Sequence, residues 1–252
     1  MAQARAEHRQ RLHRVRLEWG PVGVQVLAGD CAAVIVVDVL SFCTSVDIAV
    51  GRGAEVLPQR WGDPRTAARD AHRHAAAPAG PRSGSGPSLR PSSLLALPAG
   101  TRLALPSPNG GTLCAAAAGS GAEVFAGCLR NASAVAAAAL AVGGPIGVVP
   151  AGERWPDGTL RVAVEDAVGA GAVVAALGPD RSPEAELALA QFEAARQRGL
   201  PRVLATVSSG RELVADGYGA DVDLAAAHDC SSAVPQLLAG LLTAGGPARP
   251  SR

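Results

Sequence analysis

The stretch AAVIVVDVL at residues 32–40 is apolar and rich in valine and isoleucine, and Asp38 is its single charged residue. β-Branched side chains favour strands, and a strand that is apolar on both faces is usually buried between two layers of helices. The stretch therefore predicts a central strand of an α/β sheet. It also places one carboxylate close to the end of that strand.

Short apolar runs alternate with longer helical patterns on both sides of this stretch. The alternation predicts a three-layer α/β/α protein with a largely parallel or mixed β-sheet. The expected strands are 22–27, 32–40, 55–58, 101–105, 123–126, 146–149 and a short one at 203–205. The expected helices are 43–51, 63–77, 112–118, 132–141, 160–177, 184–198, 209–215 and 234–243.

The length of 252 residues suits one large or two small domains, and the strand–helix rhythm alone does not separate these. We expect a single α/β domain over residues 19–244. The basic start of the chain, 1–18, and its Gly/Pro-containing end, 245–252, are expected to be mobile tails. Residues 78–93 (PAGPRSGSGPSLRPSS) break the rhythm and are expected to form a loop or lid.

Composition excludes several classes of function. The chain has no lysine, so its 23 positive side chains are all arginine, and neither Schiff-base chemistry nor a P-loop lysine is available. The formal net charge of +1 predicts no nucleic-acid partner and no attraction to an anionic membrane. No apolar run is long enough to cross a bilayer. Five widely spaced cysteines without a CxxC pair are typical of reduced thiols, so we expect a cytoplasmic protein.

Polar residues follow several of the expected strands, at the turns into helices. Asp38 comes after the central strand, and SPNGG at 107–111 and Asn131 come after two others. Glycine turns at a helix start let backbone amides approach an anion. The alternatives are that Asp38 and Asn131 cap helices and that SPNGG is a plain turn. The chain has only two asparagines, and both lie at such turns.

Glu165 and Asp166 form an acidic pair within the otherwise apolar segment 160–177. The alternative is a pair of solvated side chains on one helix face. Together with Asp38, the asparagines and the glycine turns, the pair indicates a Mg²⁺-assisted site for a phosphorylated ligand, since Mg²⁺ prefers carboxylate, phosphate and water oxygens. The five histidines lack zinc-ligand spacing.

Six segments between about residues 20 and 238 match, in the same order, the pattern of one known family. They are VVDVLSFCTS at 36–45, SPNGG at 107–111, CLRNASAVA at 128–136, PAGERWPDGTLRVAVEDAVGAGAVV at 150–174, SSGREL at 208–213 and DVDLAAAHDCSSAVPQL at 221–237. On these segments the chain resembles the 2-phosphosulfolactate phosphatases, Mg²⁺-dependent acid phosphatases of α/β fold. The resemblance implies a polar site made of Asp38, Asn109, Gly110, Asn131, Glu165 and Asp166.

Two departures from the family pattern concern substrate recognition. The family usually has Asp-Val-Leu-Arg-Ala-Thr after the strand, whereas Ser41 and Phe42 follow Leu40 here. The family's Gly-Gly-Glu and Gly-Asn-Ser-Pro stretches have no clear match, and residues 78–93 stand in their place.

The leading hypothesis is a Mg²⁺-dependent phosphatase that acts on a small phosphorylated hydroxy acid such as 2-phosphosulfolactate. Asp38 is either a metal ligand or a covalent nucleophile. The expected catalytic residues are Asp38, Asn109, Asn131 and Glu165, and the expected metal ligands are Asp38, Glu165 and Asp166. The expected substrate-binding residues are Ser41, Ser107, Gly110, Gly111, Arg154, Arg161 and Arg211.

Two other hypotheses stay open at this point. One is a non-catalytic protein that binds small anions on the same scaffold, which the absence of an arginine at Ser41 favours. The other is a purely structural α/β partner. Beyond a small phosphorylated substrate, no nucleic-acid or membrane partner is expected, and a homodimer is the one assembly left open.

Overall fold

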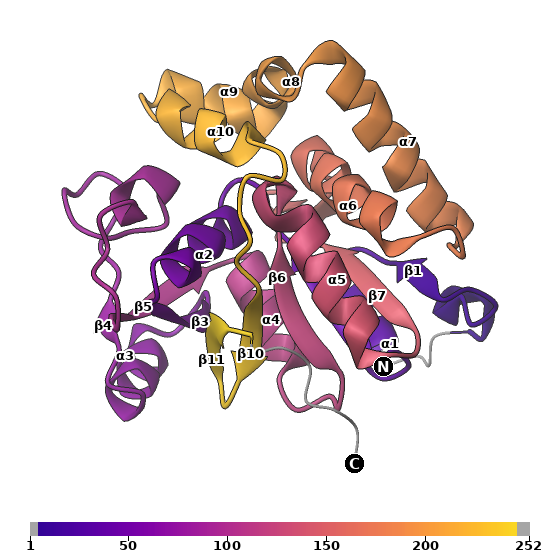
Figure 1. The fold of residues 1–252 in the computed structure, drawn as a ribbon. Helices are drawn as coiled ribbons and strands as arrows, with labels where there is room; N and C mark the ends of the chain where they lie inside the picture. The colour runs from indigo at the N-terminus through magenta and orange to yellow at the C-terminus, as the bar shows by residue number, and fades with distance from the viewer. Residues whose placement is uncertain (1–4, 246–252) are drawn as a thin grey trace.

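A computed structural model describes residues 5–245, in which nine strands form one mixed sheet with the order β1-β7-β2-β6-β10-β11-β3-β5-β4 (Figure 1). Two parallel groups, β1-β7-β2-β6 and β3-β5-β4, are joined by the antiparallel hairpin β10–β11. The strands are β1 (Val15–Leu17), β2 (Ala33–Val37), β3 (Glu55–Arg60), β4 (Ala77–Pro78), β5 (Arg102–Ser107), β6 (Glu123–Gly127), β7 (Ile146–Pro150), β10 (Pro235–Leu238) and β11 (Leu241–Ala244). A separate antiparallel pair comprises β8 (Glu153–Arg154) and β9 (Leu160–Arg161).

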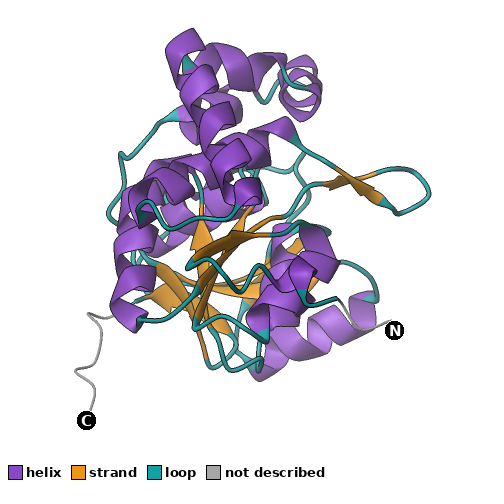
Figure 2. Ribbon diagram, turned by 90° about the vertical axis from the view of Figure 1, so that its right-hand side faces the viewer, coloured by secondary structure: helices purple, strands orange, loops and turns teal. Residues whose placement is uncertain are grey.

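Helices cover both faces of the sheet, as Figure 2 shows for the strands at its centre. They are α1 (Gly20–Ala28), α2 (Phe42–Gly51), α3 (Pro64–Arg73), α4 (Gly110–Ala117), α5 (Ala132–Val142), α6 (Val164–Leu177), α7 (Pro183–Arg198), α8 (Leu200–Thr206), α9 (Ser208–Ala215) and α10 (Gly219–Ala226). Short 3₁₀ turns lie at Glu7–Arg9, Pro91–Leu94 and Leu129–Asn131. The expected three-layer α/β/α architecture is confirmed, with a mixed sheet.

Strand β2 is the centre of the core, as the opening stretch predicts. It pairs in parallel with β6 on one side and β7 on the other, and all five of its residues are fully buried. Val34 and Val36 pack in the apolar cluster with α1, α2 and α4. Ile35 and Val37 point to the opposite face and pack with α5, α6 and α7. The alternation of strand side chains therefore carries β-branched residues into both interfaces.

Three predicted elements are wrong in type. The expected strand 22–27 belongs to α1, where Pro21 lies in the first turn and Val24, Leu27 and Ala28 face the core at helical spacing. The expected strand 203–205 lies within α8. The expected helix 234–243 is the β10–β11 hairpin, because Ala239 and Gly240 both have positive φ and form a two-residue turn. Short apolar runs do not distinguish helix from strand by periodicity alone.

Three boundaries also differ from the expectation. The helix predicted over 63–77 ends at Arg73, and Ala77 belongs to β4. The tail predicted over 1–18 is wrong for its last part, since β1 pairs in parallel with β7 and its three residues are buried. The helix predicted from residue 160 begins at Val164, because Leu160–Arg161 pairs with Glu153–Arg154 instead. The tail predicted over 245–252 lies outside the described residues except for Gly245.

Residues 78–93 lack a helix or long strand, as expected of a loop, apart from the end of β4 and the start of the turn Pro91–Leu94. The Gly80 amide donates to the Pro87 carbonyl at 2.8 Å, so the loop closes on itself. Among residues 5–245, no helix is both long and apolar enough to cross a membrane.

Candidate active site

Asp38 lies directly beyond the carboxyl end of β2, and the residue is 5% exposed. Its Oδ1 accepts a hydrogen bond from the Phe42 amide at 3.1 Å, and its Oδ2 accepts one from the Gly110 amide at 2.7 Å. Those amides belong to the first residues of α2 and α4, so two helix starts face one carboxylate. Burial raises the pKa of Asp38 to about 7, opposed by the Gly110 amide and reinforced by the carboxylate of Glu153.

Asp166 lies in the first turn of α6 and fixes the backbone on either side of the site. Its Oδ1 accepts from the Val39 amide at 2.7 Å, and its Oδ2 accepts from the Gly152 amide at 2.9 Å. Burial raises the pKa of Asp166 well above its usual value, and the charges of Asp38 and Glu165 add to this. Asp166 therefore ties the end of β2 to the segment after β7 and acts as a positioning residue.

Glu153 and Glu165 bring further carboxylates to the same place. Glu153, in β8, accepts a hydrogen bond from Asn109 Nδ2 at 2.9 Å. Burial raises the pKa of Glu153, and the charge of Glu165 raises it further. Glu165, in the first turn of α6, is 2% exposed. Like charges that share a desolvated region favour proton uptake or the binding of a cation.

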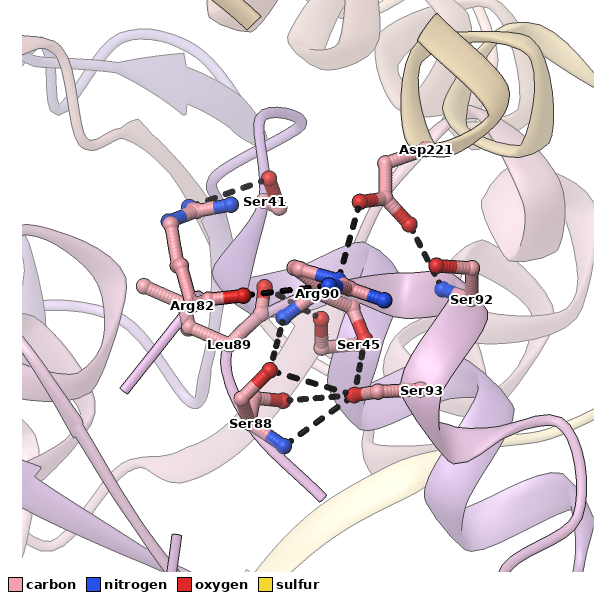
Figure 3. Close-up of polar contacts among 9 residues, drawn as sticks. All are labelled: Ser41, Ser45, Arg82, Ser88, Leu89, Arg90, Ser92, Ser93 and Asp221. Atoms are coloured by element: carbon pink, nitrogen blue, oxygen red, sulfur yellow. Dashed lines mark hydrogen bonds and ion pairs between the residues drawn. The ribbon is translucent and has the colours of Figure 1, made fainter. Parts of the chain in front are cut away.

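Asp38 and Glu153 border a cavity of about 330 Å³, which we call the Asp38 cleft, whereas Glu165 and Asp166 do not line it. An arginine from the 78–93 loop enters it, since Arg82 Nη2 donates to Ser41 Oγ at 3.4 Å (Figure 3). Burial lowers the pKa of the Arg82 guanidinium below its usual value, while the charge of Asp38 opposes this. The polar residues that line the cleft are Asp38, Ser41, Arg82, Ser107, Asn109 and Glu153.

The glycines of SPNGG are explained by close packing around Asp38. A Cβ on Gly110 would lie 2.7 Å from Asp38 Cβ and 2.8 Å from both Asp38 Oδ2 and Phe42 Cδ1. A Cβ on Gly111 would lie 3.0 Å from Ser107 Cβ. Glycine at position 110 therefore lets the start of α4 approach the carboxylate closely enough to donate its amide.

The structure does not bring Asn131 into the Asp38 cleft. Its Oδ1 accepts from the Cys128 amide at 2.9 Å, and its Nδ2 donates to the carbonyls of Ala126 and Ala233 at 3.3 and 3.2 Å. Its side chain is fully buried and bonded to the backbone. The prediction that Asn131 contacts phosphate has no support in this geometry, and the residue instead joins β6 to the segment before β10.

The three arginines predicted to bind substrate do not line the cleft either. Arg154 is exposed and donates to the carbonyls of Gly158 and Pro108. Arg161 donates to Ser209 Oγ at 3.1 Å and lies over the ring of Trp155. Arg211 is exposed on α9. Of these, Arg161 is close enough for its charge to lower the pKa of Glu153.

Two residues of the cleft were missing from the sequence-based set. Glu153 follows β7 as Asp38 follows β2, so the rule that selected Asp38 also applies to it. Arg82 carries no comparable signal, because it lies in a Pro/Gly/Ser-rich loop whose path the sequence does not define.

The carboxylates fit a hard divalent cation that retains waters. Asp38, Glu153 and Glu165 offer oxygen donors in a region where burial disfavours bare negative charge. Within residues 5–245, no group of three or more His, Cys, Asp or Glu side chains is close enough to hold a metal by itself. Mg²⁺ typically uses one or two carboxylates, with waters and phosphate oxygens completing its shell, and Asp38 and Glu153 are the two carboxylates that line the cleft.

The α/β fold places this cleft beyond the carboxyl end of a buried central strand, where enzymes of this architecture commonly bind their ligands. A family model for 2-phosphosulfolactate phosphatase matches residues 25–240. The chain therefore belongs to the 2-phosphosulfolactate phosphatase family and is a phosphoric monoester hydrolase. A search of curated proteins gave no match.

Proposed function

We propose that the enzyme is Mg²⁺-dependent and hydrolyses the phosphate ester of a small hydroxy acid, with 2-phosphosulfolactate as the leading candidate. The observation that carries the proposal is the Asp38 carboxylate, held by the amides of two helix starts beside a cleft that also contains Arg82. A volume of about 330 Å³ suits a small substrate, at the lower end of ligand pockets.

A bound Mg²⁺ would supply positive charge that neutralises the phosphoryl oxygens of the ester. Asp38 and Glu153, which both line the cleft, are the residues that would hold it. The amides of Phe42 and Gly110 keep the Asp38 carboxylate fixed, so little reorganisation is needed when charge develops on the phosphoryl group.

The surrounding residues position these acids. Asp166 fixes the backbone at Val39 and Gly152, and so sets the direction in which β2 and the segment after β7 present their acidic side chains. Asn109 Nδ2 orients Glu153 at 2.9 Å. Substrate that enters the cleft meets these preset carboxylates and the Arg82 guanidinium together.

Phosphate release from 2-phosphosulfolactate, 2-phospholactate and p-nitrophenyl phosphate tests the proposal. With Mg²⁺, we expect at least one of the two phosphorylated hydroxy acids to be hydrolysed with a higher kcat/KM than the aryl ester. Chelation with EDTA should abolish release, and added Mg²⁺ should restore it. Activity that EDTA does not affect would contradict the metal proposal. Tight binding of both hydroxy acids without turnover would contradict the catalytic proposal.

A further inference from the structure

Arg82 has an inward-facing guanidinium with an unused donor. Its Nη1 is buried and has no hydrogen-bond partner within the described part of the chain. Its Nη2 makes a single long contact with Ser41 Oγ at 3.4 Å (Figure 3). A buried N–H without an acceptor is unfavourable, so this donor is available to an acceptor that enters the cleft, whether a water, an ion or a ligand.

The charged groups around Arg82 do not pair with its guanidinium, which can therefore bind a ligand. The carboxylates of Asp38, Asp221 and Glu153 and the hydroxyl of Tyr218 act on its pKa from a distance. No carboxylate within residues 5–245 forms an ion pair with Arg82. Asp38 and Glu153 line the same cleft as Arg82, so a substrate between them meets a guanidinium on one side and carboxylates on the other.

The loop that carries Arg82 is held in place from its far end. Arg90 Nη1 donates to the Arg82 carbonyl at 3.0 Å, and the Arg90 guanidinium stacks over Tyr218 with 5.2 Å to the ring centroid. Arg90 Nε also lies 3.8 Å from Asp221 Oδ2, and the Ser92 amide donates to Asp221 Oδ1 at 2.7 Å (Figure 3). Asp221 belongs to α10, so that helix fixes the loop.

A second attachment joins the same loop to α2. Ser45 Oγ donates to the Leu89 carbonyl at 3.1 Å, and Ser93 Oγ donates to the Arg90 carbonyl at 2.7 Å (Figure 3). Because α2 begins beside Asp38, the Ser45 bond fixes the loop relative to the acidic groups of the cleft, while the Ser93 bond stabilises the end of the loop itself. The Arg82 guanidinium is therefore preorganised, which reduces the entropy lost when an anion binds.

We propose that Arg82 binds the acidic group on the carbon skeleton of the substrate, a carboxylate or sulfonate, and so selects phosphate esters that carry a second anion. A guanidinium matches such groups because its N–H donors form a planar fork that can bind two oxygens. The inference rests on the proposed function for the phosphoryl end of the substrate. Arg90 is a positioning residue that acts through the backbone of Arg82.

Steady-state kinetics with matched substrates tests the assignment. We compare 2-phospholactate and 2-phosphosulfolactate with isopropyl phosphate, which lacks the second acidic group. Arg82→Ala should lower kcat/KM about 10- to 100-fold for the acidic substrates, mainly through KM, and less than about 3-fold for isopropyl phosphate. Arg82→Lys should recover part of the loss. Arg90→Ala should raise KM for the acidic substrates alone.

Arg202 is exposed on α8, and Arg202→Ala is the matched control. It should behave as wild type with every substrate. Equal losses with acidic and neutral substrates, or no loss with either, would overturn the role of Arg82. A thermal midpoint for Arg82→Ala within about 2 °C of wild type shows that the variant is folded. If Arg82→Ala fails to fold, Arg82→Gln, which keeps the polarity and part of the length of the side chain without its charge, replaces it.

A calorimetric titration with sulfolactate separates this inference from the proposed function, because sulfolactate carries the acidic groups without the phosphate. We expect binding to wild type and a loss of about 10-fold or more in Arg82→Ala. Such binding without hydrolysis of any ester would refute the phosphatase proposal and leave Arg82 as an anion-binding residue. Equal affinity of wild type and variant, or no binding to either, would refute the assignment itself.

Discussion

Gly110→Ala tests the geometry of the cleft most sharply, because the added methyl group has no free space. Its Cβ would lie 2.7 Å from Asp38 Cβ and 2.8 Å from Phe42 Cδ1, whereas carbon atoms normally pack about 3.5–4.0 Å apart. Asp38 or the start of α4 must therefore move by about 1 Å. That movement lengthens the 2.7 Å hydrogen bond from the Gly110 amide to Asp38 Oδ2.

Two effects of known size follow from this displacement. Overpacking of a tight site destabilises a protein by about 1–3 kcal/mol, and each kcal/mol lowers the thermal midpoint by about 2–4 °C for a chain of this size. Misplacement of a catalytic group by 1 Å lowers the rate about 100-fold. We expect a midpoint about 4–8 °C lower, for a mid-range cost of about 2 kcal/mol, and a kcat/KM about 100-fold lower.

Scanning calorimetry and phosphate-release kinetics on the same preparations measure the two effects. Gly29→Ala is the control, since its Cβ would meet only the Gln25 carbonyl oxygen at 3.9 Å. The control should match wild type in both assays. A lowered midpoint with kcat/KM within about 3-fold of wild type would show that the Gly110–Asp38 contact does not support catalysis and would refute the reasoning.

Three further predictions concern residues outside the cleft. Arg130→Met leaves the buried Asp47 without its partner at 2.7 Å, so urea unfolding should show a loss of about 3–5 kcal/mol that a second change, Asp47→Asn, partly recovers. Asn131→Ala should lower stability while kcat/KM per folded molecule stays at wild type; a selective loss of kcat/KM would return Asn131 to the active site. The hydrogen bond from Arg11 lowers the pKa of Asp30 to about 2, below its value of about 3.9 in the unfolded chain. The Asp30–Arg11 pair therefore stabilises the folded protein above about pH 4, and this stabilisation is lost as the pH falls toward 2. The difference in unfolding free energy between wild type and Asp30→Asn should shrink over that range. The change should be less than about 1 kcal/mol because Arg11 is exposed. A difference that does not change with pH would contradict that pairing.

The central architecture was predictable because its signals are local. The stretch at 32–40 needs burial on both faces, and the structure supplies it through helices on both sides of β2. The hairpin β10–β11 was missed because its two apolar runs are short and its pairing with β6 and β3 is a long-range property. Its Ala239–Gly240 turn was the available local signal.

The strand-end rule accounts for several residues that the structure brings close together. Asp38, Ser107 and Asn109 line one cleft, and Glu165 and Asp166 lie close enough to influence the other acids. Asn131 also follows a strand, yet its side-chain amide forms hydrogen bonds with backbone groups. Only the fold of residues 128–233 brings those backbone groups to it.

The arginines show the limit of local signals most clearly. Position 41 is serine, whereas the family that this chain resembles usually has arginine there. No arginine close to position 41 in the sequence indicates a replacement. The structure brings Arg82 from an irregular loop 41 residues away to donate to the Ser41 hydroxyl. Hydrogen bonds to α2 and α10 determine the path of that loop. No pattern within the loop itself indicates this path.

Phosphate release from 2-phosphosulfolactate by wild type and Asp38→Asn, with Mg²⁺ present, tests the central claim most directly. The substitution keeps the size of the side chain and removes its charge. Because electrostatic stabilisation in active sites is typically worth about 100- to 1,000-fold in rate, we predict a kcat at least about 100-fold lower, with a cooperative unfolding transition retained. Asp63→Asn, at the exposed start of α3, should retain wild-type activity. An Asp38→Asn enzyme that releases phosphate at the wild-type rate would contradict the account.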